Sequence, residues 1–104
     1  MRVVWTEPAE EDRERIIFFI AQDDPQAALE MDDLFTAAAD SLATFPTRAR
    51  LGRVHGTREL IVHKNYILVY GFDEDAAAIY IKAILHASRQ WPPEDAEPFL
   101  SQTR

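Results

Sequence analysis

The chain has 104 residues, a formal net charge of −7 and no cysteine, and 47% of its residues are hydrophobic. This length and composition are typical of one globular domain and exclude wholesale disorder, while the lack of cysteine excludes disulfides, thiolate metal sites and cysteine nucleophiles. No signal peptide or membrane-spanning run is visible, so we expect a cytoplasmic protein that makes no membrane contact.

Charge is distributed unevenly along the chain. Residues 1–47 carry eleven acidic and three basic side chains, whereas residues 48–70 carry one acidic and five basic side chains. The acidic total argues against a free-standing nucleic-acid binder, because phosphate neutralisation supplies most of the affinity of such proteins. The sequence therefore predicts an acidic body with a short basic middle.

The first 23 residues predict a strand and a helix. A strand is expected over 2–6, where Val3, Val4 and Trp5 are all strand formers. Pro8 then suits the first turn of a helix. The positions that share one face of this helix are apolar: Ala9, Ile16, Ile17 and Ile20. Phe18 and Phe19 widen that face beyond a single packing stripe.

A second helix is predicted from Pro25 to Phe45. Asp24 is placed to cap it and Pro25 to take its first position. Its apolar positions follow a period of 3.6 residues over five turns: Ala27, Ala28, Met31, Leu34, Phe35, Ala38, Leu42 and Phe45. The short link between the two helices predicts an antiparallel helical hairpin.

The remainder of the chain predicts a loop and three strands. We expect a loop over 47–56, strands over 58–63, 66–72 and 77–86, and a two-residue turn at Lys64-Asn65. In the last strand, Ile79, Ile81, Ala83 and Leu85 are expected on one face and Tyr80, Lys82, Ile84 and His86 on the other.

The expected fold class is α+β, with an N-terminal helical hairpin packed on a small antiparallel β-sheet in the order β-α-α-β-β-β. We place the domain at 1–93 and a polar C-terminal tail at 94–104.

Most catalytic chemistries find no support in the motifs. The three histidines lack metal-ligand spacing, the three glycines cannot form a phosphate-binding loop, and no serine lies in a nucleophile elbow. Neighbouring carboxylates on a helix diverge by about 100°, so they indicate solvated faces. We therefore expect no metal and no cofactor.

The basic middle allows two interpretations. Arginine and histidine supply the groups of a metal-free ribonuclease, in which one group removes the 2′-hydroxyl proton and cations stabilise the phosphorane. The alternative is a loop whose arginines form ion pairs with the acidic helices, each contributing little to stability. Spacing alone favours the ion-pair interpretation.

The order of motifs resembles the RelE/ParE superfamily of type II toxin–antitoxin toxins. An acidic helical hairpin ending in Phe-Pro is followed by Gly56-Thr57-Arg58-Glu59-Leu60, then by Tyr66-Ile67-Leu68-Val69-Tyr70, and then by the segment from Ile84 to Pro92 that contains His86, Arg89 and Trp91. The resemblance covers roughly residues 1–93. It implies a small antiparallel sheet packed on an N-terminal helical hairpin, in agreement with the elements above.

The superfamily implies two possible activities. RelE-type members cut messenger RNA in the ribosomal A site, and ParE-type members poison DNA gyrase without nuclease residues. Where ribosome-dependent members carry an arginine in the Tyr66–Tyr70 strand, this chain has Ile67, and its net charge is −7. The resemblance therefore favours a ParE-like, non-catalytic toxin that binds gyrase. The alternative is a RelE-like mRNA endoribonuclease that uses His86, Arg58 and Arg89.

Under either activity, the resemblance implies a cognate antitoxin as partner. The residues expected to bind the antitoxin or the target are Phe18, Phe19, Arg53, Arg58, His63, Arg89 and Trp91. The two phenylalanines offer apolar surface beyond one core stripe, and an antitoxin segment would fold on binding. The general preference of phenylalanine for the interior favours the alternative, in which both are buried within this domain.

Overall fold

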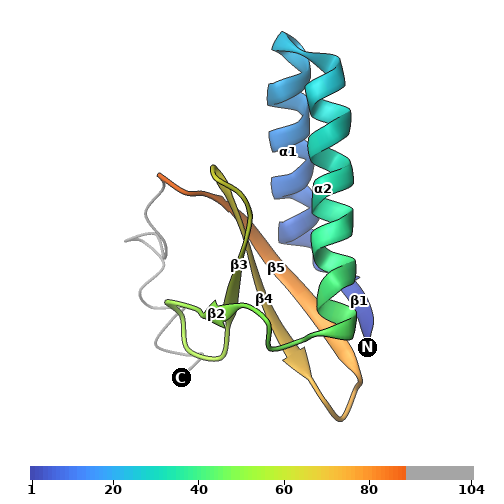
Figure 1. The fold of residues 1–104 in the computed structure, drawn as a ribbon, viewed down its shortest axis with the longest axis vertical. Coiled ribbons are helices and arrows are strands. Elements are labelled where there is room, and N and C mark those ends of the chain that lie inside the picture. The colour runs from blue at the N-terminus through green and yellow to red at the C-terminus, as the bar shows by residue number, and fades with distance from the viewer. Residues whose placement is uncertain (89–104) are drawn as a thin grey trace.

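The computed structural model describes residues 1–88. Two antiparallel helices pack on one face of a five-stranded sheet (Figure 1), so the α+β class is confirmed. The elements are β1 (Arg2–Trp5), α1 (Glu7–Asp23), α2 (Pro25–Thr44), β2 (Arg50–Leu51), β3 (Arg58–His63), β4 (Tyr66–Asp73) and β5 (Ala78–His86). None of the helices in this range has the length and apolar character needed to cross a membrane.

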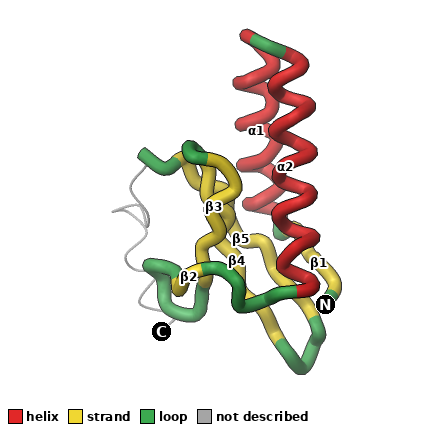
Figure 2. The backbone as a smooth tube through the Cα atoms, in the orientation of Figure 1, coloured by secondary structure: helices red, strands yellow, loops and turns green. Residues whose placement is uncertain are grey.

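The sheet has the strand order β1-β5-β4-β3-β2 and is mixed. β1 runs parallel to β5, with Arg2 opposite Ala78 and Trp5 opposite Ile81, whereas the other neighbours are antiparallel. The predicted antiparallel sheet is therefore confirmed for β2 to β5, and β1 adds a parallel edge. The helical hairpin follows β1 in the chain and returns to the start of β1, where the amino group of Met1 donates to the carbonyl of Ala43 at 3.1 Å. The loop after α2 then crosses to β2 at the opposite edge of the sheet (Figure 2).

A short fifth strand lies within the segment predicted as a loop. In β2, Arg50 pairs with Glu59 and Leu51 pairs with Arg58, and the N–H of Gly52 donates to the carbonyl of Thr57 at 2.8 Å. Two residues are too few to give a periodic pattern, so this strand depends on β3 as its template and is invisible in the sequence.

The helical hairpin forms as its caps predict. The Oδ1 atom of Asp24 accepts the N–H groups of Gln26 and Ala27 at 3.1 Å, and α2 begins at Pro25. Arg13 ties α1 to α2 because its Nε lies 2.7 Å from Oδ1 of Asp32. The same guanidinium stacks 4.6 Å from the centre of the Trp5 ring, which fixes the hairpin on β1.

The main core lies between the hairpin and the sheet. Its fully buried side chains come from both layers: Phe35, Leu42, Leu68, Tyr70, Ile79 and Ile81. Two large side chains of the predicted α2 stripe do not join it, because Leu34 is 43% exposed and Phe45 is 62% exposed. Leu34 lies at the margin of the stripe, and Phe45 is the C-cap of α2.

A β-bulge shifts the pairing of β4 with β5. Val69 pairs with Ala83, but the next residue, Tyr70, pairs with Ile81, so Lys82 is an extra residue on β5. Simple alternation therefore breaks at Lys82, and the side chains after the bulge point to the faces opposite to those that alternation predicts.

The bulge overturns the predicted faces of the last strand. Ile79 and Ile81 pack against the helices as one set, but Ile84 joins them there. A second, smaller cluster lies on the sheet face away from the helices and contains Ile67, Val69, Ala83 and Leu85. We call this surface the far face of the sheet. Strict alternation placed Ala83 and Leu85 with Ile79, and an extra residue is what separates them.

Candidate functional site

Large apolar side chains are exposed on the upper half of the helical hairpin, which extends beyond the sheet (Figure 1). Phe18 is 69% exposed and Phe19 is 71% exposed, so the expectation that both are buried is wrong. Leu29 and Leu34 on α2 are also exposed. Several large exposed apolar side chains on one part of a protein are typical of a surface that binds a partner. Leu29 was missed in the sequence because it lies outside the apolar stripe of α2.

The two phenylalanines border separate grooves on either side of α1. Phe19 lines a groove of about 280 Å³ beside the sheet, with Arg15, Ile16, Tyr66 and Ile84. Phe18 lines a groove of about 430 Å³ beside α2, with Arg13, Glu14, Ile17, Ala21 and Asp32. A polypeptide that enters either groove would therefore meet an aromatic ring and charged side chains of both signs.

Asp12 builds the wall of the groove beside the sheet. Its Oδ2 accepts the N–H of Ile84 at 3.0 Å, and its Oδ1 accepts from Arg15 at 3.1 Å. β1 pairs with β5 only as far as Ile81, so this carboxylate satisfies a backbone donor that no strand reaches.

His86 lies at the end of β5 and also lines this groove. Its Nδ1 accepts the N–H of Ser88 at 3.2 Å and lies 2.7 Å from the Oγ of Ser88. Its ring packs edge-to-face on Tyr66, with centroids 5.5 Å apart. The imidazole is thus exposed and held in one orientation.

The residues of the nuclease alternative are not brought together within the described part of the chain. On β4, Tyr66 pairs with His86 while Tyr70 pairs with Arg58, a separation of about 13 Å along the strand. Ile67 is buried on the far face of the sheet. Arg89, the third residue of this alternative, lies outside the described residues, as does Trp91.

Arg58 supports the chain segment that follows α2. Its Nη1 donates to the carbonyl of Ala49 at 2.9 Å. Beside it, the hydroxyl of Tyr70 donates to the carbonyl of Pro46 at 2.6 Å, and burial raises the pKa of Tyr70. The Arg58 side chain therefore binds the backbone of the segment after α2, and only part of its guanidinium faces solvent.

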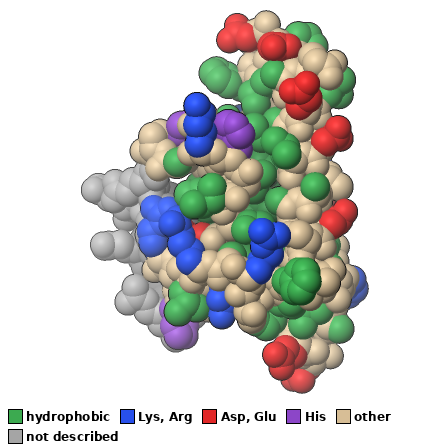
Figure 3. Space-filling model, in the orientation of Figure 1, with side chains coloured by type: hydrophobic (Ala, Val, Ile, Leu, Met, Phe, Trp, Pro, Cys, Tyr) green, Lys and Arg blue, Asp and Glu red, His purple; other side chains and the backbone are tan. Residues whose placement is uncertain are grey.

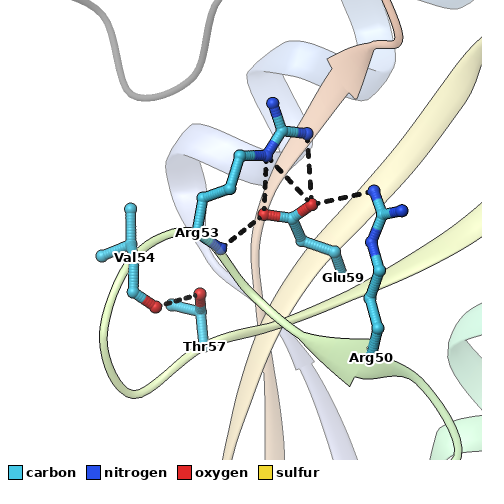
Figure 4. A network of polar contacts seen from close by, with 5 residues as sticks. All are labelled: Arg50, Arg53, Val54, Thr57 and Glu59. Atoms are coloured by element: carbon cyan, nitrogen blue, oxygen red, sulfur yellow. Dashed lines mark hydrogen bonds and ion pairs between the residues drawn. The ribbon is translucent and has the colours of Figure 1, made fainter.

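The basic middle is organised around a buried carboxylate, Glu59, whose side chain is 1% exposed. Arg53 donates to it from its backbone N–H at 2.9 Å and from its guanidinium, and Arg50 donates from Nη2 at 3.1 Å (Figure 4). The sequence predicted that these arginines form ion pairs with the acidic helices, and this prediction is wrong. Arg50 and Arg53 pair instead with Glu59, because the pairing of β2 with β3 places Arg50 opposite Glu59.

Burial alone would raise the pKa of Glu59, because the charged form loses hydration. Hydrogen bonds from the side chain and backbone of Arg53, and from Arg50, outweigh this, so the pKa of Glu59 lies below its ordinary value of 4.5.

Replacing Glu59 with glutamine is expected to destabilise the fold by roughly 1–3 kcal/mol at pH 7, because two arginines lose their carboxylate. Since the folded pKa is lowered, the stabilisation is complete above about pH 4.5 and is lost as the pH falls through the folded pKa. Urea unfolding from pH 7 to pH 3 should therefore show the wild type converging on Glu59→Gln in acid. Glu74→Gln, an exposed turn variant, should match the wild type at pH 7, and equal losses in both variants would contradict the prediction.

The remaining histidines, His55 and His63, lie apart from any metal-binding group within residues 1–88. His63 ends β3, and its Nδ1 is buried without a hydrogen-bond partner among the described residues, while His55 is exposed. No group of three or more histidine, aspartate or glutamate side chains within residues 1–88 is arranged to hold a metal ion.

The molecule separates its charges in space. Figure 3 shows acidic side chains along the helical hairpin and basic side chains over the sheet and its loop. The segment from Glu7 to Thr44 contains eleven acidic and two basic residues. The exposed phenylalanines thus lie in acidic surroundings, and the arginines of the basic middle lie elsewhere.

Comparison with known proteins identifies relatives over most of the chain. Residues 3–91 match the family described as the ParE toxin of the type II toxin-antitoxin system parDE. The chain is 36% identical over 92 residues to "Putative toxin Y4kP" of Sinorhizobium fredii, covering 88% of this chain and 93% of the relative. It is 39% identical over 88 residues to "Toxin RelE2" of Caulobacter vibrioides, covering 85% and 97%.

Two solved structures share the fold at 20% sequence identity. A chain of the chromosomal ParDE system from P. aeruginosa superposes with a TM-score of 0.72 and covers 83% of this chain and 95% of its own length. A chain of the RelBE2 toxin-antitoxin complex from Mycobacterium tuberculosis has a TM-score of 0.58, with 82% and 95% covered. Given the family match and the two relatives, this chain belongs to the ParE toxin family of type II toxin–antitoxin systems, within the RelE/ParE superfamily.

Proposed function

We propose that this ParE-family toxin inhibits growth by binding DNA gyrase, without catalysis, and that a cognate antitoxin neutralises it. The observation that carries the non-catalytic part is the separation of His86 from Arg58 along β4. A general acid or base acts only within hydrogen-bond reach of the group it serves, and a cation must lie where charge develops. Arg58 is instead engaged with the carbonyl of Ala49.

The position of Ile67 supports the same proposal. A charge in that strand is what the ribosome-dependent members of the superfamily supply, and here the side chain is apolar and packs with Val69, Ala83 and Leu85. The acidic hairpin would also repel the phosphates of ribosomal RNA. Gyrase as the target comes from the ParE-type members of the superfamily, and binding a protein requires no transition-state charge at Ile67.

The proposal of an antitoxin partner has two supports. The two solved structures described above come from toxin–antitoxin systems, ParDE and RelBE2. In this chain, Phe18 and Phe19 leave apolar surface exposed on the upper half of the hairpin. A segment that folds on binding would remove both rings from water, and basic residues on its flanks would complement the acidic hairpin.

The test is a gyrase supercoiling assay run in parallel with in vitro translation on one toxin preparation. We expect micromolar toxin to block supercoiling, the antitoxin to restore it, and translated messages to stay intact. Unimpaired supercoiling at micromolar toxin would overturn the gyrase proposal. Because inhibition by binding does not need the imidazole, His86→Ala should leave the block intact.

A ribosome-dependent endoribonuclease is the second candidate, because the His86 imidazole is exposed and oriented beside Tyr66 and a groove. It predicts codon-positioned cuts in translated messages. Cuts that disappear in His86→Ala would establish this candidate and displace the first.

A further inference from the structure

Four apolar side chains are buried on the far face of the sheet, although both helices lie on the opposite face. They are between 0% and 7% exposed: Ile67, Val69, Ala83 and Leu85. All five strands belong to the one sheet and α1 and α2 pack on its other side (Figure 1), so no helix or strand within residues 1–88 forms a layer over the far face. Apolar side chains on a sheet face are buried only where something packs on them. Another part of the molecule must therefore cover them.

The cover is confined to β4 and β5. Ile61 of β3 lies opposite Ile67 and shares the far face with it, yet Ile61 is 57% exposed. The loop after β2 reaches one end of this face, because a Cβ atom added at Gly71 would lie 3.3 Å from the carbonyl oxygen of Gly56 and 3.3 Å from Cε of Lys82. Ile67 lies four residues from Gly71 along β4, a distance of about 13 Å. The loop therefore does not explain why Ile67 is buried.

The rest of the chain starts beside this face, at the end of β5. The N–H of Ala87 donates to the carbonyl of Asn65 at 2.8 Å, which holds the chain at the turn between β3 and β4. Ala87 and Ser88 form a turn, so the chain leaves the direction of the strand here. Residues 89–104 follow, and sixteen residues span up to about 50 Å when extended. This length exceeds that of β5, whose nine residues span about 30 Å.

The sequence of this segment matches the far face in spacing. Leu85 and Trp91 each stand three residues from Ser88. Lys82 and Glu94 each stand six residues from it. An extended segment that returned along β5 would therefore bring the indole level with Leu85 and the first acidic residue level with Lys82. The Pro-Pro pair between the indole and this acidic residue favours an extended backbone.

The charges of the segment and of the far face are complementary. Arg50 and Arg53 share the buried carboxylate of Glu59 (Figure 4) and are themselves half-exposed. Within residues 1–88 the structure pairs Lys82 with no carboxylate, so these three cations carry more charge than Glu59 neutralises. We call Arg50, Arg53 and Lys82 the far-face cations. Residues 94–97 are acidic except for one alanine, and we call their three carboxylates the acidic run: Glu94, Asp95 and Glu97.

We propose that residues 89–97 of this chain return over the far face, where Trp91 covers the apolar side chains and the acidic run pairs with the far-face cations. The inference concerns contacts within one chain, so it goes beyond the proposed function and is independent of the target. It gives Trp91 an internal contact in place of the partner contact that the resemblance implied. A face covered in this way is closed to anionic ligands, and the exposed phenylalanines of the hairpin are left for a partner.

The test measures how fast iodoacetamide, an uncharged reagent, labels a single cysteine in the full chain. The chain has no cysteine of its own, so each introduced thiol is read without background. Ala83→Cys reports on the covered strands, and Ile61→Cys reports on the exposed part of the same face. In the free chain we expect Ala83→Cys to react at least about tenfold more slowly than Ile61→Cys at every protein concentration, because a buried thiol reacts only when its cover opens.

Two triple variants with the same net charge then test the acidic run. The first neutralises it: Glu94→Gln, Asp95→Asn and Glu97→Gln. The matched control neutralises three exposed acids of the hairpin: Glu11→Gln, Glu30→Gln and Asp33→Asn. We expect the first variant to speed the labelling of Ala83→Cys at least about fivefold and the control to leave it unchanged. Arg50→Gln with Lys82→Gln keeps the Arg53–Glu59 pair and removes the other side of the contact, so it should speed labelling by a similar factor.

Equal labelling rates in the acidic-run variant and its control would overturn the inference, as would equal rates for Ala83→Cys and Ile61→Cys in the free chain. Protection that appears only as the protein concentration rises would assign the cover to a second copy of the chain and would also overturn it. Protection that appears only after the antitoxin is added would do the same. The supercoiling assay measures the proposed function separately, so these failures leave it standing. An unchanged melting temperature shows that each variant is folded.

Discussion

Replacing Phe18 and Phe19 together with serine is expected to weaken antitoxin binding by at least about 100-fold, because aromatic anchors at the centre of an interface carry most of its free energy. The two rings are the most exposed aromatic side chains of the hairpin and border separate grooves on α1. A partner that covers both would bury large apolar area that now faces water. Isothermal titration of each toxin variant with the antitoxin measures the change.

The matched control is Phe45→Ser, which replaces an exposed phenylalanine outside this surface. Phe45 is the C-cap of α2, and it lies at the end of the hairpin away from Phe18 and Phe19. Its affinity should stay close to that of the wild type. The Phe18/Phe19 variant should also unfold at the same or a higher temperature, since its rings contribute little to the core. Retained affinity in the double variant, or an equal loss in Phe45→Ser, would refute the assignment of this surface.

The helical hairpin could be predicted from the sequence because its signals are local. Asp24 and Pro25 mark the boundary between the helices, and the 3.6-residue period marks the buried face of α2. The same period does not say how far the sheet reaches along the hairpin. Phe18 and Phe19 look like core residues in a sequence, and they are exposed because the hairpin extends beyond the sheet (Figure 1).

The details of the sheet depend on contacts between residues far apart in the chain. The bulge at Lys82 appears only when β5 is aligned with β4, and it moves Ile84 to the helix side. The parallel pairing of β1 with β5 joins segments more than 70 residues apart. Strict alternation of side chains predicts neither the bulge nor the parallel pair. The order of the elements could therefore be predicted from the sequence, but the faces of the last strand could not.

The candidate site shows the same division. The charge count located the basic middle, but it favoured the acidic helices as the partner of Arg53, because the position of Glu59 beside Arg53 depends on the pairing of β2 with β3. His86 and Arg58 were grouped by residue type, and the register of β4 separates them. The binding roles assigned to Arg53, Arg58 and His63 stay predictions.

Phe35→Ala is expected to destabilise the fold by about 3–5 kcal/mol, because the residue is fully buried where the hairpin meets the sheet. Its ring packs edge-to-face on Tyr66 of β4 with centroids 5.8 Å apart, and the guanidinium of Arg13 lies 6.0 Å from its centre. Removing it opens a cavity that a helix anchored by Arg13 cannot collapse into. In a domain of ordinary stability, this loss is a large part of the total free energy of unfolding, and the melting temperature should fall by at least roughly 12 °C.

Phe45→Ala is the control, because it makes the same deletion at an exposed position near the end of α2. Urea unfolding should place its free energy of unfolding within about 1 kcal/mol of that of the wild type. If both alanine variants lost the same stability, the core between the hairpin and the sheet would not be centred on Phe35.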